Sequence, residues 1–364
     1  MKIPVLLMAR ELHVGGSERQ MTETARCLDR TEFEPHVGCF YPAGLRGDEL
    51  REAGIPVVQF PVKSFGSPNA LTQARALARY VRDHGIRIVH AWDYPLNVYA
   101  VPIARTMTKA VAVSSQRSAR ALIPPMYRRL VRLSDRFANA VVVNCEYLRR
   151  QLTEEEHVPA SKVHVCYNGI DLERFRRLPT GPHPLTIGAV CGLRPEKDLK
   201  TLIRAVAGAH KTITELRLLI VGSGPELAIL QQYVREAGVA ELTRFEPATA
   251  RVPECLSEID IFVLPSLSEA FSNSLMEAMA CGCCCVASNV GGNPELVTEG
   301  ETGLLFPAGD ARALTRVLQR LIADPAERDR LAANATRRID ERFSRQSAAK
   351  RMGEIYRAVL ESKL

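Results

Sequence analysis

The chain has 364 residues, 46% of them hydrophobic, which is enough for two α/β domains with full cores. Lys and Arg exceed Asp and Glu by 48 minus 41, or seven, and no apolar run reaches the roughly 18 residues that a membrane helix needs. The N-terminal run PVLLMA is too short for a signal sequence and suits a first strand. We therefore expect a cytoplasmic protein and exclude an integral membrane protein.

The positive charge is concentrated in the first half of the chain. We count 26 basic and 18 acidic residues up to Thr180, against 22 and 23 after it. This asymmetry favours an anionic partner for the first half, such as a phosphorylated acceptor or an acidic membrane surface.

The first half alternates apolar strand-like runs with helical patterns, which predicts a doubly wound parallel sheet. The predicted strands cover residues 4–9, 36–40, 57–60, 86–91, 110–115 and 139–145. Gly15 and Gly16 follow the first strand, where glycine lets the backbone approach a ligand and leaves amides directed at it. A simple tight turn explains the two glycines equally well.

Two polar residues lie at the carboxyl end of the strand at 86–91, an edge where such sheets bind ligands. His90 could bind an acceptor or carry a proton, and Asp93 shares that edge. Either residue could instead cap a loop, and the sequence does not separate the two interpretations.

Residues 124–136 predict a basic amphipathic helix. Met126, Leu130 and Leu133 fall near one side, and arginines at 128, 129, 132 and 136 fall elsewhere. Such a helix could rest on an anionic membrane. Alternatively, it packs on the sheet with its arginines extended into solvent.

The stretch LPTGPHP is the best linker in the chain because it is rich in Pro and Gly. We therefore divide the chain into a first domain at 1–178, a linker at 179–184 and a second domain at 185–343. A last helix covers 344–364.

The second half begins with a strand at 185–192, which is followed by Arg194 and Lys197. Two cations at the end of a strand could neutralise a diphosphate leaving group, although a salt-bridged surface pair is the alternative. Gly222 lies in a later strand-to-helix turn. This turn lacks the full dinucleotide fingerprint, so a nicotinamide cofactor is not expected.

The most informative stretch is 264–295, which follows an apolar strand at 259–265. It predicts a helix capped by Ser272 or Asn273 and stopped by Gly282, with Glu269 before the helix and Glu277 inside it. The first amides of such a helix favour a phosphate. These amides belong to Phe271, Ser272, Asn273, Ser274 and Leu275. Each carboxylate could accept hydrogen bonds from vicinal hydroxyls of a sugar nucleotide, whereas an isolated pair would be solvated surface glutamates.

Four cysteines cluster at 281 and 283–285. Consecutive residues of a strand point to alternate faces, so these side chains cannot converge on one zinc ion. We expect packed, reduced thiols and no metal site.

The pattern EAFSNSLMEAMACG, followed by VASNVGGNPELV and ETGLLFPAGD, resembles the donor-site signature of the retaining glycosyltransferases of family four. GGSERQ, YNGIDLERF, LRPEKD and LLIVGSGPE extend the resemblance through most of the chain. The resemblance implies the GT-B fold, in which two Rossmann-like domains face a cleft. It also implies that the last helix crosses back to the first domain.

The resemblance also assigns roles. Gly16 would face the donor phosphates, Gly222 would lie beside the nucleotide, and Arg251 and Val252 would hold the base. Glu269 would hold the donor sugar and Glu277 the ribose. The usual arginine is replaced by Gly192, and the usual cleft histidine by Gln116 and Arg117, which makes Arg117 a candidate for an anionic acceptor.

The resemblance implies a retaining transferase, and the cations and helix amides predict that it needs no metal and no resident cofactor. Its donor would be a UDP- or GDP-sugar and its acceptor a glycan or lipid-linked hydroxyl, in cell-surface polysaccharide synthesis. We expect no nucleic acid partner, and a peripheral contact with the inner face of an anionic membrane fits the basic helix. A sugar-nucleotide epimerase and a non-catalytic sugar-nucleotide-binding module are the alternatives.

Overall fold

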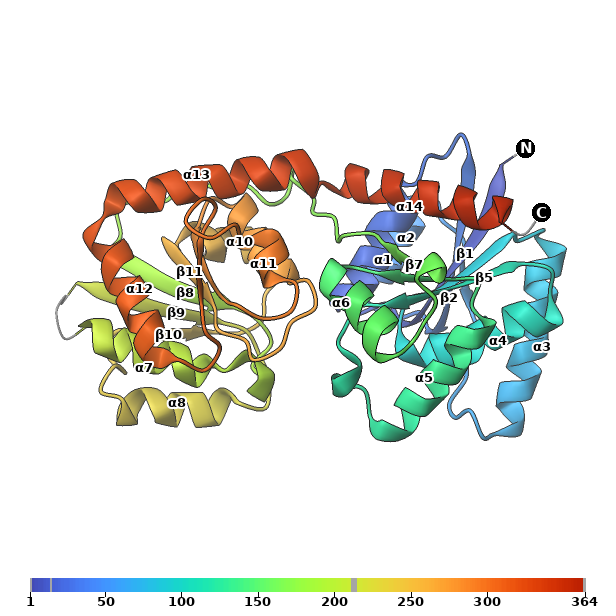
Figure 1. Cartoon of the computed structure of the whole chain (residues 1–364), viewed down its shortest axis with the longest axis horizontal. Helices are drawn as coiled ribbons and strands as arrows, with labels where there is room; N and C mark the ends of the chain where they lie inside the picture. The colour runs from blue at the N-terminus through green and yellow to red at the C-terminus, as the bar shows by residue number, and fades with distance from the viewer. Residues whose placement is uncertain (1, 14, 211–214, 363–364) are drawn as a thin grey trace. The chain divides into compact units, whose positions relative to one another are not determined.

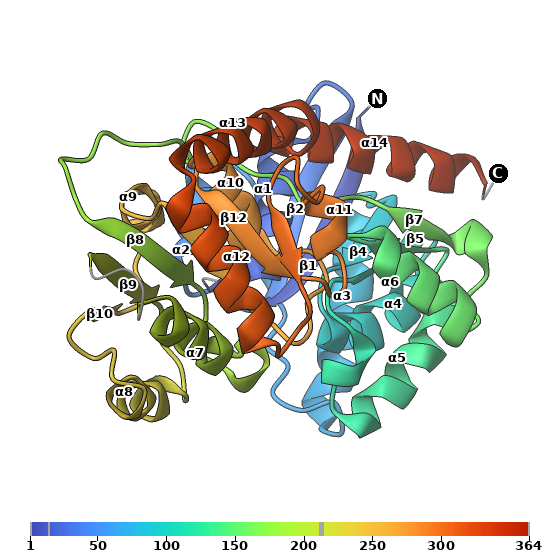
Figure 2. The same cartoon turned by 60° about the vertical axis from the view of Figure 1, so that its left-hand side comes forward.

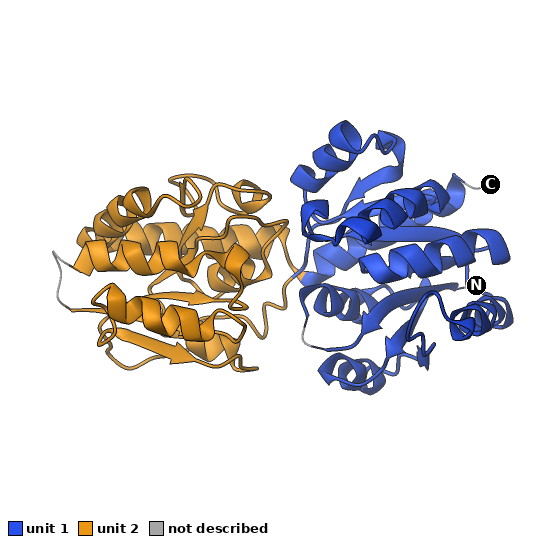
Figure 3. Ribbon diagram, turned by 90° about the horizontal axis from the view of Figure 1, so that it is seen from below, with its two compact units in different colours: residues 1–169, 345–364 blue, residues 170–344 orange. Residues whose placement is uncertain are grey.

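A computed structural model describes residues 2–13, 15–210 and 215–362, so the outermost ends of the predicted domain ranges, at 1 and 363–364, lie outside the described residues. The chain divides into two compact units, which are coloured separately in Figure 3. Unit 1 comprises residues 1–169 and 345–364, and unit 2 comprises residues 170–344.

The described part of unit 1 contains a seven-stranded parallel sheet in the order β3-β2-β1-β4-β5-β6-β7. All six strands predicted in the first half are confirmed. Most of their residues are buried in a sheet covered on both faces, while the edge strand β3 is only half-buried. The strands are β1 (Ile3–Glu11), β2 (Phe33–Tyr41), β3 (Val57–Gln59), β4 (Ile88–Ala91), β5 (Val111–Gln116), β6 (Ala140–Val143) and β7 (Val163–Val165).

Two groups of helices cover this sheet, as Figure 1 shows. α1 contacts α2 and α14 in one group, and α4 contacts α3 and α5 in the other. The helices are α1 (Gly16–Cys27), α2 (Leu45–Glu52), α3 (Pro68–Asp83), α4 (Tyr94–Met107), α5 (Pro125–Phe137), α6 (Glu146–Arg150) and α14 (Arg345–Glu361). Short turns of other helix types occur at η1 (Arg120–Leu122), η2 (Gln151–Glu155) and η3 (Ala160–Lys162).

Unit 2 repeats the plan, with a six-stranded parallel sheet in its described residues. The strand order is β10-β9-β8-β11-β12-β13. The strands are β8 (Leu185–Val190), β9 (Leu216–Val221), β10 (Thr243–Glu246), β11 (Ile261–Leu264), β12 (Cys284–Ser288) and β13 (Leu304–Phe306).

The helices of unit 2 also form two groups (Figure 2). α7 contacts α8 and α12, whereas α10 contacts α9 and α13. The helices are η4 (Pro195–Lys197), α7 (Leu199–His210), α8 (Leu227–Glu236), α9 (Val252–Ser257), α10 (Asn273–Ala280), α11 (Asn293–Leu296), α12 (Ala311–Ala323) and α13 (Pro325–Arg342). The predicted fold of two doubly wound α/β domains is confirmed.

Each sheet has one point where the strand order reverses. In unit 1 the reversal lies between β1 and β4, and in unit 2 it lies between β8 and β11. Connections leave such a pair of strands in opposite directions, which opens a crevice at their carboxyl ends where ligands bind in this class of fold. The loops after β8 and β11 are therefore the first place to look for a site in unit 2.

The structure changes the expected division between the domains. It separates the units after Gly169, nine residues before the sequence-based boundary at 178. Residues 170–178 belong to unit 2 because Arg177 donates to the carbonyl oxygen of Ile259 at 3.0 Å and the amide of Leu178 bonds Ser257 Oγ at 2.9 Å. α14 packs in unit 1, where Met352 and Tyr356 join its buried core.

The cysteine cluster is packed inside unit 2, and all four thiols are buried. Cys284 joins the core beneath α7 and α12, whereas Cys283 Sγ donates to the carbonyl oxygen of Leu256 at 3.3 Å. Burial raises the pKa of Cys281 and of Cys284 to about 12, so these thiols stay protonated at neutral pH.

Candidate functional site

The two loops at the strand reversal of unit 2 are bonded to each other through their backbones. The first loop leaves β8 and contains η4, and the second leaves β11 and ends at α10. The amide of Leu267 in the second loop donates to the carbonyl oxygen of Glu196 in the first at 2.8 Å. This bond fixes how close the side chains of the two loops can come.

Lys197 and Glu269 meet across these loops. Lys197 Nζ forms an ion pair with Glu269 Oε1, and Ser266 Oγ donates to the same oxygen at 2.7 Å. The two charged side chains are only 12% and 11% exposed, so little water screens the pair. Within the described residues no hydrogen bond reaches Glu269 Oε2, which leaves one carboxylate oxygen for a ligand hydroxyl.

Ser266 is a site residue that sequence reasoning missed. It is fully buried, and its carbonyl oxygen accepts from Ser288 Oγ at 2.6 Å, at the end of the neighbouring strand β12. Its position directly after β11, at the carboxyl edge of the sheet, was the available signal.

The N-terminus of α10 follows Glu269. Ser272 is its cap, as predicted, and its side chain accepts from the amide of Leu275 at 3.3 Å. The amide of Leu275 is therefore occupied in this structure, contrary to the expectation of five open amides. The helix ends before Gly282, whose φ of +71° suits the predicted stop. Glu277 is only 6% exposed, which rules out a solvated surface glutamate.

Gly291 lies directly against the loop that carries Glu269. A Cβ at this position would lie 1.8 Å from the carbonyl oxygen of Glu269, and φ is +55°, so only glycine fits. The next residue, Gly292, donates its amide to the carbonyl oxygen of Ala270 at 2.8 Å. The two glycines thus allow the loop after β12 to pack closely against the loop that carries Glu269.

Gly222 supports the lysine loop in the same way. With φ of +154°, a Cβ there would lie 1.9 Å from the carbonyl oxygen of Cys191, and one at Gly224 would lie 2.2 Å from that of Leu193. The amide of Leu193 donates to the carbonyl oxygen of Ser223 at 3.0 Å. Close packing of the loops after β8 and β9 therefore accounts for these glycines.

Arg194 lies on the outside of its loop, with its side chain 59% exposed. Its Nε forms an ion pair with Glu196 Oε1 at 3.0 Å. For Arg194 the structure therefore shows the alternative interpretation, a salt-bridged pair at the surface. Lys197 is also paired, but its pair is nearly buried. Gly192 has room beside it, because an added Cβ would meet only Arg194 Nε, at 3.5 Å.

The residues expected around the nucleotide base lie at the start of α9. Arg251 is the cap of α9, with a side chain 77% exposed and paired with Glu254 at 3.2 Å. Val252 is the first residue of that helix. Both remain candidates on position alone.

In unit 1, Gly15 and Gly16 begin α1 at the end of the loop after β1. A Cβ on Gly15 would lie 1.8 Å from Glu18 Oε2, so the carboxylate of Glu18 lies over the start of the helix. Burial raises the pKa of Glu18. The glycine accommodates this close approach.

His90 lies in the interior of unit 1 and is not exposed at all. Its Nδ1 is 2.8 Å from Tyr356 Oη on α14, and its Nε2 is 2.9 Å from Ser115 Oγ on β5. Burial lowers the pKa of His90 well below its usual value. Both ring nitrogens are occupied, so the expectation that His90 contacts an acceptor is corrected to a neutral histidine that joins α14 to the sheet.

Asp93 caps α4, which was the alternative interpretation for this residue. Its Oδ1 accepts from the amide of Leu96 at 2.9 Å, and its Oδ2 accepts from the amide of Arg10 at 2.7 Å. Burial raises the pKa of Asp93 to about 7 despite these bonds. The carboxylate thus ties the end of β1 to the end of β4.

Arg117 follows β5 and stacks over the ring of Trp92, with its guanidinium carbon 4.0 Å from the ring centroid. One terminal nitrogen donates to Asn168 Oδ1 at 2.8 Å. Its buried Nε has no hydrogen-bond partner in the described residues, and burial lowers the pKa of Arg117 to about 10. A cation with an unused donor suits an anionic group.

Two family models match this chain and together span most of it. "Glycosyltransferase Family 4" matches residues 14–174, and "Glycosyl transferases group 1" matches residues 173–338. The second match contains Lys197, Glu269 and Glu277.

Curated relatives are about one third identical. A D-inositol 3-phosphate glycosyltransferase of Rhodococcus opacus is 32% identical over 285 residues, which are 71% of this chain and 62% of the relative. An alpha-maltose-1-phosphate synthase of Mycobacterium tuberculosis is 30% identical over 249 residues, 61% of this chain and 64% of the relative. The chain thus spans less than two thirds of either relative.

Solved structures share the fold over nearly the whole chain. Anabaena HepE in complex with UDP and glucose superposes with a TM-score of 0.84 at 23% identity, covering 97% of this chain and 98% of that one. At this identity the likeness describes the arrangement of strands and helices. Among the described residues, no helix is both long and apolar enough to cross a membrane.

Proposed function

The chain belongs to the group 1 glycosyltransferases of glycosyltransferase family 4, and from this premise we propose that it moves a sugar from a nucleoside diphosphate donor to an acceptor hydroxyl with retention of configuration. The observation that carries the proposal is the pairing of Lys197 with Glu269 at the strand reversal of unit 2. The pairing places a cation next to a carboxylate that can accept hydrogen bonds from sugar hydroxyls. Both lie at the edge where sheets of this class bind ligands.

Each side chain has a role in the proposed reaction. Negative charge builds on the departing diphosphate as the glycosidic bond stretches, and Lys197 together with the N-terminus of α10 stabilises it. Glu269 orients the donor sugar through Oε2, and Glu277 holds the ribose. The acceptor hydroxyl attacks the anomeric carbon from the same face as the diphosphate departs, and its proton passes to an oxygen of the departing diphosphate.

Arg194 adds a second cation in this proposal. Its present pair with Glu196 is exposed, and exposed pairs contribute only about 0.2–1 kcal/mol, so exchange to a phosphate is inexpensive. Two cations and helix amides can neutralise a diphosphate without a divalent metal. We therefore expect transfer to persist in the presence of a chelator.

The finer assignments concern the nucleotide of the donor and the nature of the acceptor. UDP in the neighbouring structure favours a UDP-sugar over a GDP-sugar as the donor. The phosphate named in the substrate of the inositol relatives, together with the unused Nε of Arg117, favours an anionic acceptor near Arg117 and Asp93. A glycan or lipid-linked acceptor in cell-surface polysaccharide synthesis, reached by peripheral contact with a membrane, completes the proposal.

The test compares Lys197→Ala and Glu277→Ala with the native protein in assays of donor binding and sugar transfer. We expect transfer to fall about 100-fold or more in each variant, as for loss of one group that stabilises the transition state, while circular dichroism shows that each variant still folds. The unfolding temperature of Lys197→Ala should fall, because Glu269 is left as an unpaired, nearly buried carboxylate. Lys200→Ala is the matched control, because Lys200 Nζ lies 5.8 Å from the Tyr233 ring on α8.

Full transfer activity in either site variant would contradict the proposal. Conversion of the donor to an isomeric sugar nucleotide without an acceptor would indicate an epimerase instead. Tight donor binding, measured by thermal stabilisation, without any transfer or hydrolysis would indicate a binding module.

A further inference from the structure

One helix of unit 1 exposes its apolar side. In α5, Met126 is 68% exposed, Leu130 38% and Leu133 50%, and Leu122 just before the helix is 52% exposed. The spacing of four and three residues puts Met126, Leu130 and Leu133 along one line of the helix surface. The interpretation in which this apolar side packs on the sheet is therefore wrong.

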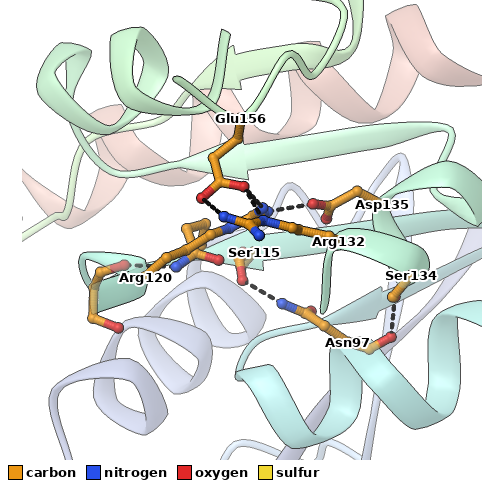
Figure 4. A network of polar contacts seen from close by, with 9 residues as sticks. Asn97, Ser115, Arg120, Arg132, Ser134, Asp135 and Glu156 are labelled. Carbon is orange, nitrogen blue, oxygen red and sulfur yellow. Dashed lines mark hydrogen bonds and ion pairs between the residues drawn. The ribbon is translucent and has the colours of Figure 1, made fainter. Parts of the chain in front are cut away.

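The opposite side of α5 is the one that is buried. Its inward residues are Val131, Ser134 and Asp135. Ser134 Oγ donates to the carbonyl oxygen of Asn97 on α4, and Asp135 forms an ion pair with Arg120, which is only 3% exposed. Figure 4 shows these contacts on the inner side of the helix. They fix the rotation of α5, so its apolar line faces outward in the folded unit.

A second part of the polar network neutralises the charge of Glu156, which lies beside α5. Glu156 accepts from Arg120 Nη1 at 3.3 Å and from Arg132 Nη2 at 2.9 Å (Figure 4). The carboxylates in contact with α5 are thus paired with arginines, and Asp135, the one acidic residue of the helix, points inward.

The outward cations lie beside the apolar line. Arg129 and Arg136 are both exposed, and neither has a hydrogen-bond or ion-pair partner in the part of the chain that the structure describes. With Arg132 they form one flank of the helix, next to Met126, Leu130 and Leu133. An apolar line with a purely cationic flank is complementary to a surface that is apolar inside and negative outside.

We propose that α5, with Leu122, is a docking surface for an anionic lipid membrane. The apolar side chains enter the boundary between headgroups and acyl chains, and Arg129 and Arg136 contact lipid phosphates. A second copy of this chain fits the surface less well, because two such helices would bring like charges together. Docking does not require the transfer reaction to take place. It rests on the proposed function in one respect, because docking would bring unit 1 near a lipid-linked acceptor.

The experiment is flotation of the whole protein with vesicles of phosphatidylglycerol and phosphatidylcholine. We expect the native protein to float with mixed vesicles at low salt and not with phosphatidylcholine alone. The double variant Arg129→Gln with Arg136→Gln should bind roughly 30-fold more weakly, since each arginine near an anionic surface contributes about 1 kcal/mol. Leu130→Gln with Leu133→Gln should lose binding at least as strongly.

Matched controls come from unit 2. Arg312→Gln with Arg316→Gln removes two exposed arginines of α12, and Ile229→Gln changes a side chain 45% exposed on α8, so all should float like the native protein. Donor binding, followed by thermal stabilisation, should be unchanged in every variant, which separates docking from the proposed transfer. Absent flotation of the native protein, equal flotation of the α5 variants, or a native dimer that the leucine variants dissociate would each overturn the proposal.

Discussion

At the scale of single residues, the site depends on which partner each charged side chain has. Lys197 is committed to Glu269 in a nearly buried pair, whereas Arg194 is paired at the surface with Glu196. The two cations are three residues apart in the sequence but lie in different environments. Burial strengthens the pair of Lys197, whereas water screens the pair of Arg194. The two cations should therefore respond differently to substitution.

Arg194→Ala should lower transfer about tenfold, less than the loss at Lys197, because an exposed cation must first leave Glu196 and stabilises charge less well. Adding Gly192→Arg to Arg194→Ala should restore the lost transfer activity, since position 192 has room for a side chain. Steady-state kinetics of the two single variants and the double variant measure this. An unchanged rate in Arg194→Ala would remove Arg194 from the site.

His90 predicts a dependence of stability on pH. The folded chain keeps the ring neutral because its pKa is depressed, while the unfolded chain takes up a proton below its usual value of 6.5. The stabilisation is thus fully present above pH 6.5 and is lost as pH falls toward the folded pKa, by about 1.4 kcal/mol per unit. Asp93, whose pKa is raised to about 7, acts in the opposite direction in this range, so the His90 contribution is the difference between the native protein and His90→Gln. Denaturant titrations between pH 5 and 7 should show that the native protein loses stability more steeply than His90→Gln as pH falls. Equal slopes would contradict the assignment.

Sequence reasoning found the charged residues of the site but not their contacts. Lys197, Glu269 and Glu277 were singled out because the family resemblance covers them, since their positions after strands or in a capped helix left surface residues as an equal alternative. Ser266 was missed since a serine after a strand is common, and only the fold shows its hydroxyl aimed at Glu269. His90 was misjudged because the position of a strand end does not reveal that α14, far along the chain, covers it.

At the scale of elements, close contacts between loops explain several glycines better than direct ligand binding does. The loops after β8 and β9 approach so closely that Gly222 has no space for a Cβ. Strand periodicity predicted both strands, but it carries no information about how tightly their following loops pack. α5 gives the converse case, because its helical pattern was predicted correctly, while the sequence left open which side of the helix packs inward.

Gly222→Ala should lower the free energy of unfolding of unit 2 by about 3 kcal/mol, since the new methyl group overlaps the carbonyl oxygen of Cys191. Gly238→Ala is the matched control. It also has positive φ, at +70°, but nothing lies within 4 Å, so only the backbone cost of about 1–2 kcal/mol applies. Guanidinium unfolding followed by circular dichroism compares the two, and equal losses would show that crowding at Gly222 is relieved at little cost.

At the scale of the whole molecule, both units use one architecture, and the alternation of strands and helices was enough to predict it. The boundary was harder. Proline and glycine at 178–184 marked a flexible composition, but Arg177 and Leu178 already bond to unit 2, so the chain enters that unit earlier. Contacts between residues distant in sequence decide such boundaries, and composition does not record them.

The return of α14 to unit 1 predicts unequal effects of a truncation. Removing residues 345–364 takes away Tyr356, which packs against Phe33 with ring centroids 5.9 Å apart and bonds His90. Amide hydrogen exchange should show protection lost across β1, β2 and β4 while unit 2 keeps its protection. Tyr356→Phe, a milder change, should cost about 1–3 kcal/mol by leaving a buried ring nitrogen unpaired. Retained protection in unit 1 after truncation would contradict this dependence.

The chain has a single tryptophan, Trp92, which is 1% exposed and lies close to both the guanidinium of Arg117 and the ring of His90. Its emission therefore reports on the interior of unit 1 alone, whereas ellipticity samples the helices of both units. Recording the two signals in one denaturation experiment gives separate midpoints for the two halves of the chain without any added fluorophore. The same indole should also sense an anion that draws Arg117 away from its face, providing an optical titration for acceptor candidates.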